Sequence, residues 1–312
     1  MTVSLLLLLG GLALLALAAD RFVVSASRIS AALGLSPILI GALVIGLGTS
    51  APEMLVSALA AGRGEIDLAL GNVVGSNTAN MTLVLGSTAL VMPLASRLRT
   101  IRREGALMLV SLVAFALVLW NLELDRLEAA GLAVGMAAAA ALLIWWARSD
   151  ARAGRTPRVA GEFEEWDGSV RRETLVAVGT LAATLAGADL LVRGASGLAD
   201  DLGISSAFVG LVIVSVGTSL PELATALAAA RRGQTDLVLG NVLGSNLFNT
   251  LAVAAIAGLI SPGVVADTFR DALVLMVGAG LAAGVFAISG KVERWEGAML
   301  LVVFLAFVAV AV

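Results

Sequence analysis

The chain has 312 residues, of which 59% are hydrophobic and only 14% are charged. Because about a quarter of the residues in soluble domains are charged, a mean hydropathy of +1.01 predicts an integral membrane protein. The net charge of −3 is too small to indicate a charged macromolecular partner such as nucleic acid. The sequence has neither cysteine nor histidine, which excludes disulfides, thiolate metal sites and imidazole proton relays. The first segment lacks a basic N-terminal stretch, so no cleavable signal peptide is expected.

Apolar segments long enough to cross a bilayer core of about 30 Å as helices follow one another along the chain. They lack the alternating hydrophobicity that is typical of a transmembrane barrel. The predicted spans are ten, at 2–24, 37–61, 67–92, 104–121, 127–147, 173–199, 206–230, 236–260, 270–289 and 295–312. The expected fold class is therefore an all-α integral membrane protein with ten transmembrane helices.

Basic residues are distributed unevenly between the predicted connections. Fifteen lysines and arginines lie in the odd-numbered connections, whereas only Arg63, Arg126 and Arg270 lie in the even-numbered ones. Because short cytoplasmic loops are enriched in lysine and arginine, we expect the odd-numbered connections to be cytoplasmic. Both termini would then lie on the extracellular or periplasmic side.

The two remaining basic residues, Arg21 and Arg193, lie inside predicted spans. Each is close in sequence to an aspartate, Asp20 or Asp189. We interpret them as ion-paired or snorkelling residues and not as transport ligands.

The longest connection, residues 148–172, has an arginine-rich half and an acidic half. It lacks the alternating Asp and Asn ligands and the central glycine of a calcium-binding loop. We interpret it as a solvated cytoplasmic linker, with calcium sensing as the alternative.

An internal repeat relates the two halves of the chain. Residues 33–80 align with residues 202–249 at a constant offset of 169, and 23 of the 48 aligned positions are identical. The offset spans five crossings, an odd number, so the second copy enters the membrane from the opposite face. The sequence therefore predicts two inverted five-helix repeats, residues 1–147 and 173–312. Inverted repeats of this kind commonly place a substrate site near the midplane, on discontinuous helices.

The second and seventh spans carry the phrase Gly-Thr-Ser-x-Pro-Glu, which ends at Glu53 and again at Glu222. An ionisable group at membrane depth costs about 2.5–3.5 kcal/mol on insertion scales and indicates a functional site. Pro52 and Pro221 remove a backbone donor and leave carbonyls free. Broken backbone is tolerated in a membrane only where it is buried in protein or lines a cavity.

The third and eighth spans carry a second repeated phrase, Gly-Asn-Val-x-Gly-Ser-Asn-x-x-Asn. Its serine and last asparagine, Ser76 with Asn80 and Ser245 with Asn249, are four residues apart and share a helix face. Carboxylate, hydroxyl, amide and carbonyl oxygens without sulfur or imidazole suit hard cations such as Ca²⁺ and Na⁺. Two other interpretations remain, namely interhelical hydrogen bonding and a static pair of protonated glutamates.

These paired motifs resemble the two alpha repeats of the calcium/cation antiporter superfamily, and most closely its prokaryotic sodium/calcium exchanger branch. The resemblance implies that helices two, three, seven and eight enclose the ions while helices one and six slide across that core. It also implies Na⁺-driven Ca²⁺ extrusion without a cofactor, with about three Na⁺ for each Ca²⁺. A monomer in a prokaryotic inner (plasma) membrane is expected.

The resemblance also implies a set of ion ligands made of side chains and backbone carbonyls. The side-chain ligands would be Thr49, Ser50, Glu53, Ser76, Asn80, Thr218, Ser219, Glu222, Ser245 and Asn249, and the carbonyls would lie near Gly46 and Ser215. The chain departs from some relatives in one respect, because archaeal and potassium-dependent relatives have aspartate at the position of Asn249. We therefore expect transport that is independent of K⁺.

The main alternative is a Ca²⁺/H⁺ antiporter of the same superfamily. That branch typically has a glutamate where this chain has Gly75 and Gly244, which favours Na⁺. A passive cation channel is a further alternative that only countertransport against a gradient separates from an exchanger. An enzyme is disfavoured because no nucleophile–base pair is visible, and no phosphate-binding loop indicates the use of ATP.

Overall fold

The computed structural model of the chain describes residues 1–33, 37–95, 99, 101–154, 168–201, 215–267 and 269–311. Ten successive helical segments fill these described ranges. In chain order they are α1 (Thr2–Leu33); α2, η1, α3 and α4 (Pro37–Ile40, Gly41–Ile45, Gly46–Thr49 and Ala51–Gly62); α5, η2 and α6 (Ile66–Ala79, Asn80–Val84 and Leu85–Val91); η3, α8 and η4 (Ile101–Gly105, Ala106–Val118 and Leu119–Asn121); α9 (Arg126–Arg152); α10 (Val170–Asp201); α12 and α13 (Ser215–Thr218 and Leu220–Arg231); α14, η6 and α15 (Thr235–Leu247, Phe248–Val253 and Ala254–Ile260); α16 (Phe269–Ala287); and α17 (Arg294–Ala311).

The protein is an all-helical membrane protein. Within the described ranges, six helices are long and apolar enough to cross a bilayer, and a seventh candidate is the bent pair that joins Gly41–Thr49 to Ala51–Gly62. The segments at 66–91, 215–231 and 294–311 bring the described total to ten. This agrees with the ten predicted spans, although residues 206–214 of the predicted seventh span lie outside the described part.

Three helices extend beyond their predicted bounds. α1 continues to Leu33, α9 continues to Arg152, and α10 begins at Val170 and ends at Asp201. Hydropathy detects only the apolar part of a helix, whereas the backbone continues to form its own hydrogen bonds in water after the apolar part ends. Residues 155–167 of the predicted linker lie outside the described part, and within the described part its first five residues and its last three are helical.

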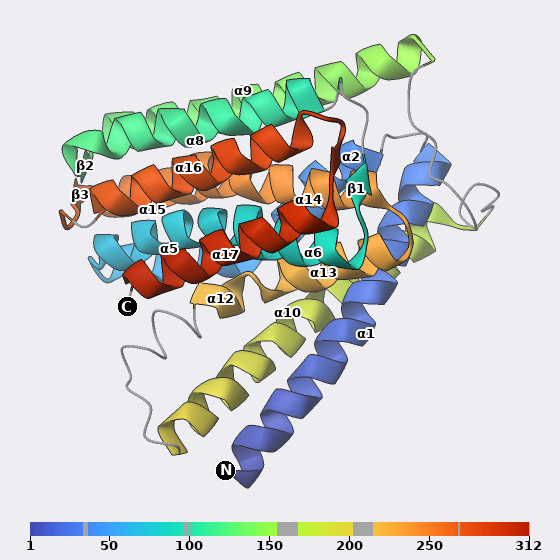
Figure 1. Cartoon of the computed structure of the whole chain (residues 1–312), viewed down its shortest axis with the longest axis horizontal. Coiled ribbons are helices and arrows are strands. Elements are labelled where there is room, and N and C mark those ends of the chain that lie inside the picture. Colours follow the sequence, from blue (N-terminus) through green and yellow to red (C-terminus); the bar gives the residue numbers. More distant parts are fainter. Residues whose placement is uncertain are drawn as a thin grey trace.

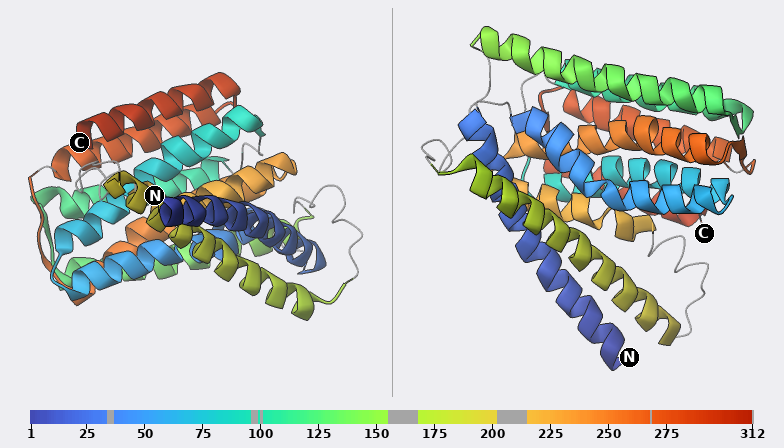
Figure 2. Two further views of the ribbon diagram at one scale, coloured as in Figure 1. Left: turned by 90° about the horizontal axis from the view of Figure 1, so that it is seen from below. Right: turned by 180° about the vertical axis from the view of Figure 1, so that it is seen from behind.

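The bundle has two distinct sides (Figures 1 and 2). α9 lies along one side, and the long helices α1 and α10 cross the opposite side together. α1 and α10 approach each other at glycines, because a Cβ added to Gly11 would lie 2.4 Å from the backbone nitrogen of Leu191. The equivalent atom on Gly187 would lie 2.6 Å from the backbone nitrogen of Leu15. The two helices are therefore in backbone contact, as small residues permit in membrane proteins.

The two repeats meet in the same way at the centre of the bundle, where η1 packs against α14. A Cβ on Gly244 would lie 2.2 Å from the carbonyl oxygen of Ala42, and one on Gly41 would lie 2.7 Å from that of Leu237. No side chain fits at either contact, so only glycine allows the helices to approach this closely. This close contact brings the helix breaks of one repeat next to the serines and asparagines of the other.

Two short antiparallel strand pairs tie the halves together outside the bundle. β1 (Leu94–Ala95) pairs with β4 (Lys291–Val292), and β2 (Glu123–Leu124) pairs with β3 (Gly263–Val264). β3 lies 169 residues after β1 and β4 lies 168 residues after β2, so β3 corresponds to β1 and β4 to β2. The symmetry of the repeats therefore exchanges the two pairs. The sequence did not predict these strands, because two residues are too few to show a period.

Candidate ion-binding site

Each repeat contains one broken helix, and the break precedes a glutamate by three residues. Ser50 separates α3 from α4 with φ −81° and ψ 8°, and Ser219 separates α12 from α13 with φ −87° and ψ 4°. In the first repeat the axes on the two sides of the break differ by 48°. Proline follows each serine by two residues and accounts for the break, because it has no N–H to donate to the preceding turn. Glu53 and Glu222 therefore lie in the first turns of α4 and α13.

The structure buries every side chain in the predicted ligand set. Glu53 is 0% exposed and Glu222 is 1% exposed. The serines, threonines and asparagines of the set are between 0% and 8% exposed. The ten residues lie in α3, α4, α5, η2, α12, α13, α14 and η6 and, for Ser50 and Ser219, at the two helix breaks. Ser215 is the first described residue of α12, and the position of its side chain lies outside the described part.

Several polar atoms of this cluster have no hydrogen-bond partner within the described part of the chain. They include both carboxylate oxygens of Glu53, one oxygen of Glu222 and both side-chain polar atoms of Asn80 and Asn249. The hydroxyls of Ser76 and Ser219 are also unpartnered. Leaving a buried polar group unpaired costs about 1–3 kcal/mol, and more when the group is charged. Unpaired oxygens gathered from both repeats fit a cation site, since a bound ion would satisfy all of them.

The two glutamates are held differently. Glu222 Oε1 accepts hydrogen bonds from Ser50 Oγ at 3.0 Å and from Ser245 Oγ at 3.4 Å. The hydroxyls of Ser76 and Thr218 face the Glu53 carboxylate, but no described residue donates to it within hydrogen-bond geometry. Ser50 belongs to the first repeat, so the second-repeat carboxylate is fixed by both halves of the protein. The Glu53 carboxylate is less constrained by hydrogen bonds in this state.

Two asparagines that the sequence did not single out as ligands link the halves. Asn72 donates from Nδ2 to the carbonyl oxygen of Glu53 at 3.3 Å, and its Oδ1 lies 3.4 Å from Thr218 Oγ1. Asn241 repeats this arrangement with the carbonyl of Glu222 at 3.3 Å and Thr49 Oγ1 at 3.3 Å. Each asparagine therefore joins a glutamate of its own repeat to a threonine of the other. Their equivalence at an offset of 169 was the sequence signal that could have identified them.

Asn80 begins the π-helical segment η2, and Asn249 is the second residue of the π-helical segment η6. A π-helical turn has an extra residue that changes the direction of the following side chains, and such turns occur frequently at functional sites. One turn earlier, the amide nitrogens of Asn77 and Asn246 donate to the carbonyls of Val73 at 2.9 Å and Val242 at 2.6 Å. Their Oδ1 atoms are buried and have no partner among the described residues, so they are additional candidate ligands.

The carbonyl oxygen of Gly46 lies at the same place as the side-chain cluster. It accepts hydrogen bonds from the backbone nitrogen of Ser50 at 3.0 Å, from Thr49 Oγ1 at 3.4 Å and from Ser245 Oγ at 3.4 Å. The predicted carbonyl ligand near Gly46 is thus adjacent to Ser245 of the other repeat, and its role stays a prediction.

The site contains few charges for its size. No group of three or more acidic, histidine or cysteine side chains that could hold a metal exists within the described ranges. Calcium affinity increases with the number of charged ligands and with the rigidity of the site. Two carboxylates among neutral oxygens therefore suit an ion that must be released again.

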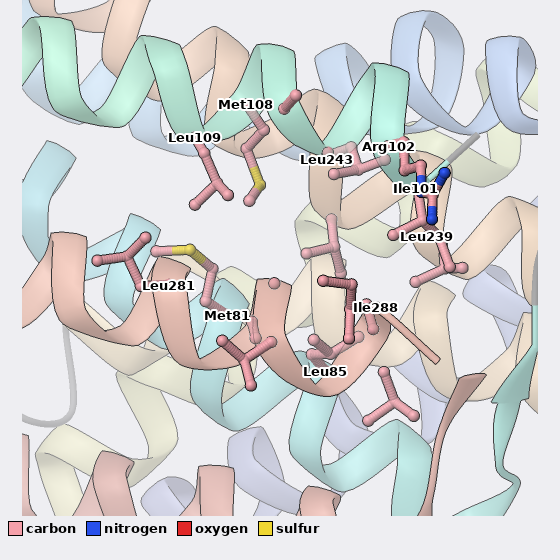
Figure 3. A pocket seen from close by; sticks show the side chains of 18 residues that line it. Met81, Leu85, Ile101, Arg102, Met108, Leu109, Leu239, Leu243, Leu281 and Ile288 are labelled. Carbon is pink, nitrogen blue, oxygen red and sulfur yellow. The ribbon is translucent and has the colours of Figure 1, made fainter. Parts of the chain in front are cut away.

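A separate cavity of about 320 Å³ is lined by residues of η2, α6, η3, α8, α14 and α16 (Figure 3). Its walls are apolar side chains such as Met81, Met108 and Leu109, and Arg102 is its one charged lining residue. A cavity without carboxylates or hydroxyls offers a cation no ligands. The candidate ion site is therefore the polar cluster around the glutamates.

Comparison with known proteins was consistent with this geometry. The chain matches the family described as "Sodium/calcium exchanger protein" over residues 3–148 and 173–312. It is 39% identical to a candidate antiporter named CaxA from Alkalimonas amylolytica, over 98% of both chains. It is 36% identical to the inner membrane protein YrbG of Escherichia coli, over 82% of this chain and 80% of that protein.

Two similar proteins are sodium/calcium exchangers by name. MaX1 from Methanosarcina acetivorans is 32% identical over 99% of this chain and 98% of its own. A structure of the sodium-calcium exchanger NCX_Mj, soaked with Na⁺ and Sr²⁺, has a TM-score of 0.84. That structure is 30% identical and covers 98% of both chains.

Proposed function

The chain belongs to the sodium/calcium exchanger protein family, and we propose that it exchanges Na⁺ for Ca²⁺ by alternating access at the Glu53/Glu222 site. Family membership makes the chain a cation/calcium exchanger and a transporter, not an enzyme. The identity of the coupling ion, the stoichiometry and the ligand set belong to the proposal. One observation supports it most strongly: the buried, unpaired oxygens around the two glutamates come from both repeats.

Mutual exclusion of the two ion types is the proposed basis of exchange. Neither glutamate forms an ion pair with a described lysine or arginine, so bound cations supply the positive charge. A Ca²⁺ ion neutralises two carboxylates, and Na⁺ ions can do so as well. Cations in one small cavity repel each other strongly because the local dielectric constant is low. Occupation by Na⁺ therefore displaces Ca²⁺, and the reverse.

We further propose that about three Na⁺ replace each Ca²⁺ and that K⁺ is not required. With two carboxylates, three Na⁺ give a loaded site of charge about +1, whereas Ca²⁺ gives a nearly neutral one. Each cycle would then move net charge, which the membrane potential drives by about 2.3 kcal/mol per charge per 100 mV. Since YrbG of Escherichia coli is an inner membrane protein, we place the protein as a monomer in the corresponding membrane, with both termini outside.

The test is uptake of ⁴⁵Ca²⁺ into proteoliposomes that contain the purified protein. Liposomes loaded with Na⁺ should accumulate Ca²⁺ against its gradient, and liposomes loaded with choline should not. A third preparation carries only an H⁺ gradient. Uptake driven by H⁺ alone would establish the Ca²⁺/H⁺ alternative, and equilibration without accumulation would establish a passive channel.

A further inference from the structure

Two acid–base couples occupy equivalent places in the repeats, outside the ion site. Asp20 and Asp189 are separated by the repeat offset of 169, and so are Arg63 and Arg232. The aspartates lie on α1 and α10, and the arginines are the C-cap residues of α4 and α13. The repeat symmetry therefore makes Asp20–Arg232 and Asp189–Arg63 equivalent couples. Each would join α1 or α10 to a core helix of the opposite repeat.

One of these two couples is closed in the structure. Nε and Nη2 of Arg232 donate to the two carboxylate oxygens of Asp20 at 2.9 and 2.7 Å. Asp189 instead pairs with Arg193 of its own helix at 2.8 Å. Arg63 has no ion pair with a residue in the described part of the chain. Full twofold symmetry would close both couples or neither, so the difference indicates a conformational state.

α1 and α10 are built to move as one unit. In addition to the backbone contact at their glycines, an ion pair and a hydrogen bond join the two helices, one near each end. Glu173 Oε1 accepts from Arg21 Nη2 at 2.7 Å at one end. Asp201 Oδ2 accepts from Ser4 Oγ at 3.2 Å at the other end. A change in one couple is therefore transmitted to the other along this pair of helices.

The packing of α1 and α10 against the core shows the same asymmetry as the two acid–base couples. α1 packs along α13, but the symmetry-equivalent contact between α10 and α4 is not formed to a comparable extent among the described residues. The N-terminal end of α1 and the C-terminal end of α10 project away from the bundle (Figures 1 and 2). The unit is thus seated at the Asp20–Arg232 end and separated at the Asp189–Arg63 end.

We propose that the two couples are alternating latches that determine from which end the ion site is open. Closure of Asp20–Arg232 seats the α1–α10 unit on α13, and closure of Asp189–Arg63 seats it on α4 after the unit has slid. A rigid unit cannot be seated at both ends in one position, so the latches close alternately. This inference rests on the proposed exchange by alternating access. The basic-residue distribution places the latch that is closed here at the cytoplasmic end.

The expected effect of removing one latch follows from its exposure. The side chains of Asp20 and Arg232 are 48% and 29% exposed, so solvent screens the couple. Ion pairs with this exposure change an equilibrium by about two- to fivefold. The apparent affinity of a ligand falls in proportion to the fraction of protein in the binding-competent state. A shift of the access equilibrium therefore appears as a shift in half-saturation at one face.

The repeat supplies its own matched control. We expect Arg232→Gln to lower the Ca²⁺ concentration for half-maximal transport at the cytoplasmic face by about two- to fivefold. Arg63→Gln should raise it by a similar factor, because the opposing latch is lost. Asp20→Asn should lower this Ca²⁺ concentration as Arg232→Gln does, and Asp189→Asn should raise it as Arg63→Gln does. The exchanged couple Asp20→Arg with Arg232→Asp should restore the parent value. If the two arginines had only a structural role, both variants would shift the half-saturating Ca²⁺ concentration in the same direction.

Cross-linking tests whether the open couple ever closes. The chain has no native cysteine, so Arg63→Cys with Asp189→Cys can be bridged by a short bifunctional thiol reagent during turnover. We expect this bridge and the one at Asp20→Cys with Arg232→Cys each to stop transport, and reduction of the reagent to restore it. Two results would overturn the latch proposal while wild-type exchange persists. One is that the Arg63–Asp189 bridge does not form. The other is that Arg63→Gln and Arg232→Gln shift the half-saturating Ca²⁺ concentration in the same direction. Alternating bridges without Na⁺-dependent Ca²⁺ uptake in the parent would instead refute the proposed exchange.

Discussion

Removal of one negative charge from the site is the sharpest test of the ion assignment. Glu53→Gln and Glu222→Gln keep the size of the side chain and one potential oxygen ligand. In Glu222→Gln the side-chain oxygen can still accept the 3.0 Å hydrogen bond from Ser50. We therefore expect both variants to fold and to be extracted like the parent protein.

The loss of affinity can be judged from burial. Because Glu53 is 0% exposed and Glu222 is 1% exposed, water does not screen either carboxylate. Removing one partner of a buried ion pair costs about 3–5 kcal/mol. At about 1.4 kcal/mol for each factor of ten, Ca²⁺ affinity should fall by roughly two to four orders of magnitude. Na⁺-dependent Ca²⁺ flux at micromolar Ca²⁺ would then be undetectable.

The assay is ⁴⁵Ca²⁺ uptake in Na⁺-loaded proteoliposomes, with Ca²⁺ titration calorimetry of the detergent-solubilised protein. Glu104→Gln is the matched control, because Glu104 is also a buried glutamate and is only 5% exposed. It lies outside the ion site, where its carboxylate pairs with Arg103 at 3.0 Å. Its variant should transport even if it is less stable. Normal flux in Glu53→Gln or Glu222→Gln would refute the assignment of the carboxylates.

Four further predictions concern transport, topology, the positioning role of Asn241 and packing. Transport by the parent should not require K⁺ and should carry net charge. K⁺-dependent or electroneutral flux at clamped voltage would contradict the proposed charge balance, in which Asn249 contributes no third carboxylate. Ala153→Cys should react with impermeant thiol reagents from the cytoplasmic face and Glu123→Cys from outside, whereas the reverse pattern would invert the predicted orientation. Asn241→Ala should reduce exchange by about tenfold or more, because it removes the hydrogen bonds of Asn241 to the Glu222 carbonyl at 3.3 Å and to Thr225 at 3.2 Å. Each buried group that is left unpaired costs about 1–3 kcal/mol. Unchanged flux would exclude a positioning role for Asn241. Gly244→Ala should prevent stable folding, since its Cβ would lie 2.2 Å from the Ala42 carbonyl oxygen, and a thermal melt of a properly folded variant would contradict the close packing.

The sequence predicted those features that follow from composition and from the repeat. A low charge content and long apolar segments predicted the membrane fold and its ten helices. The repeated proline two residues after Ser50 and Ser219 predicted helix breaks, and both breaks are present. These features depend on local chemistry, which a sequence contains. The burial of the ten predicted side-chain ligands likewise agrees with their position beside the repeat motifs.

Other features depend on tertiary contacts that no local pattern encodes. The π-helical turns at Asn80 and Asn249 arise where a helix accommodates one extra residue against its neighbours. The hydrogen bonds of Asn72 and Asn241 join positions that are 146 and 192 residues apart. A sequence shows that these residues are repeated, but not which atoms they reach.

Differences between the repeats carry a separate kind of information. The repeated phrases make Glu53 and Glu222 equivalent, yet the structure bonds the carboxylate of Glu222 to Ser50 and leaves that of Glu53 without a bond from a described residue. Asp20 is likewise paired across the repeats whereas Asp189 is not. An inverted repeat has two equivalent asymmetric arrangements, and one molecule can adopt only one of them at a time. Where equivalent residues of the repeats differ in their contacts, we therefore expect those contacts to change during the proposed transport cycle.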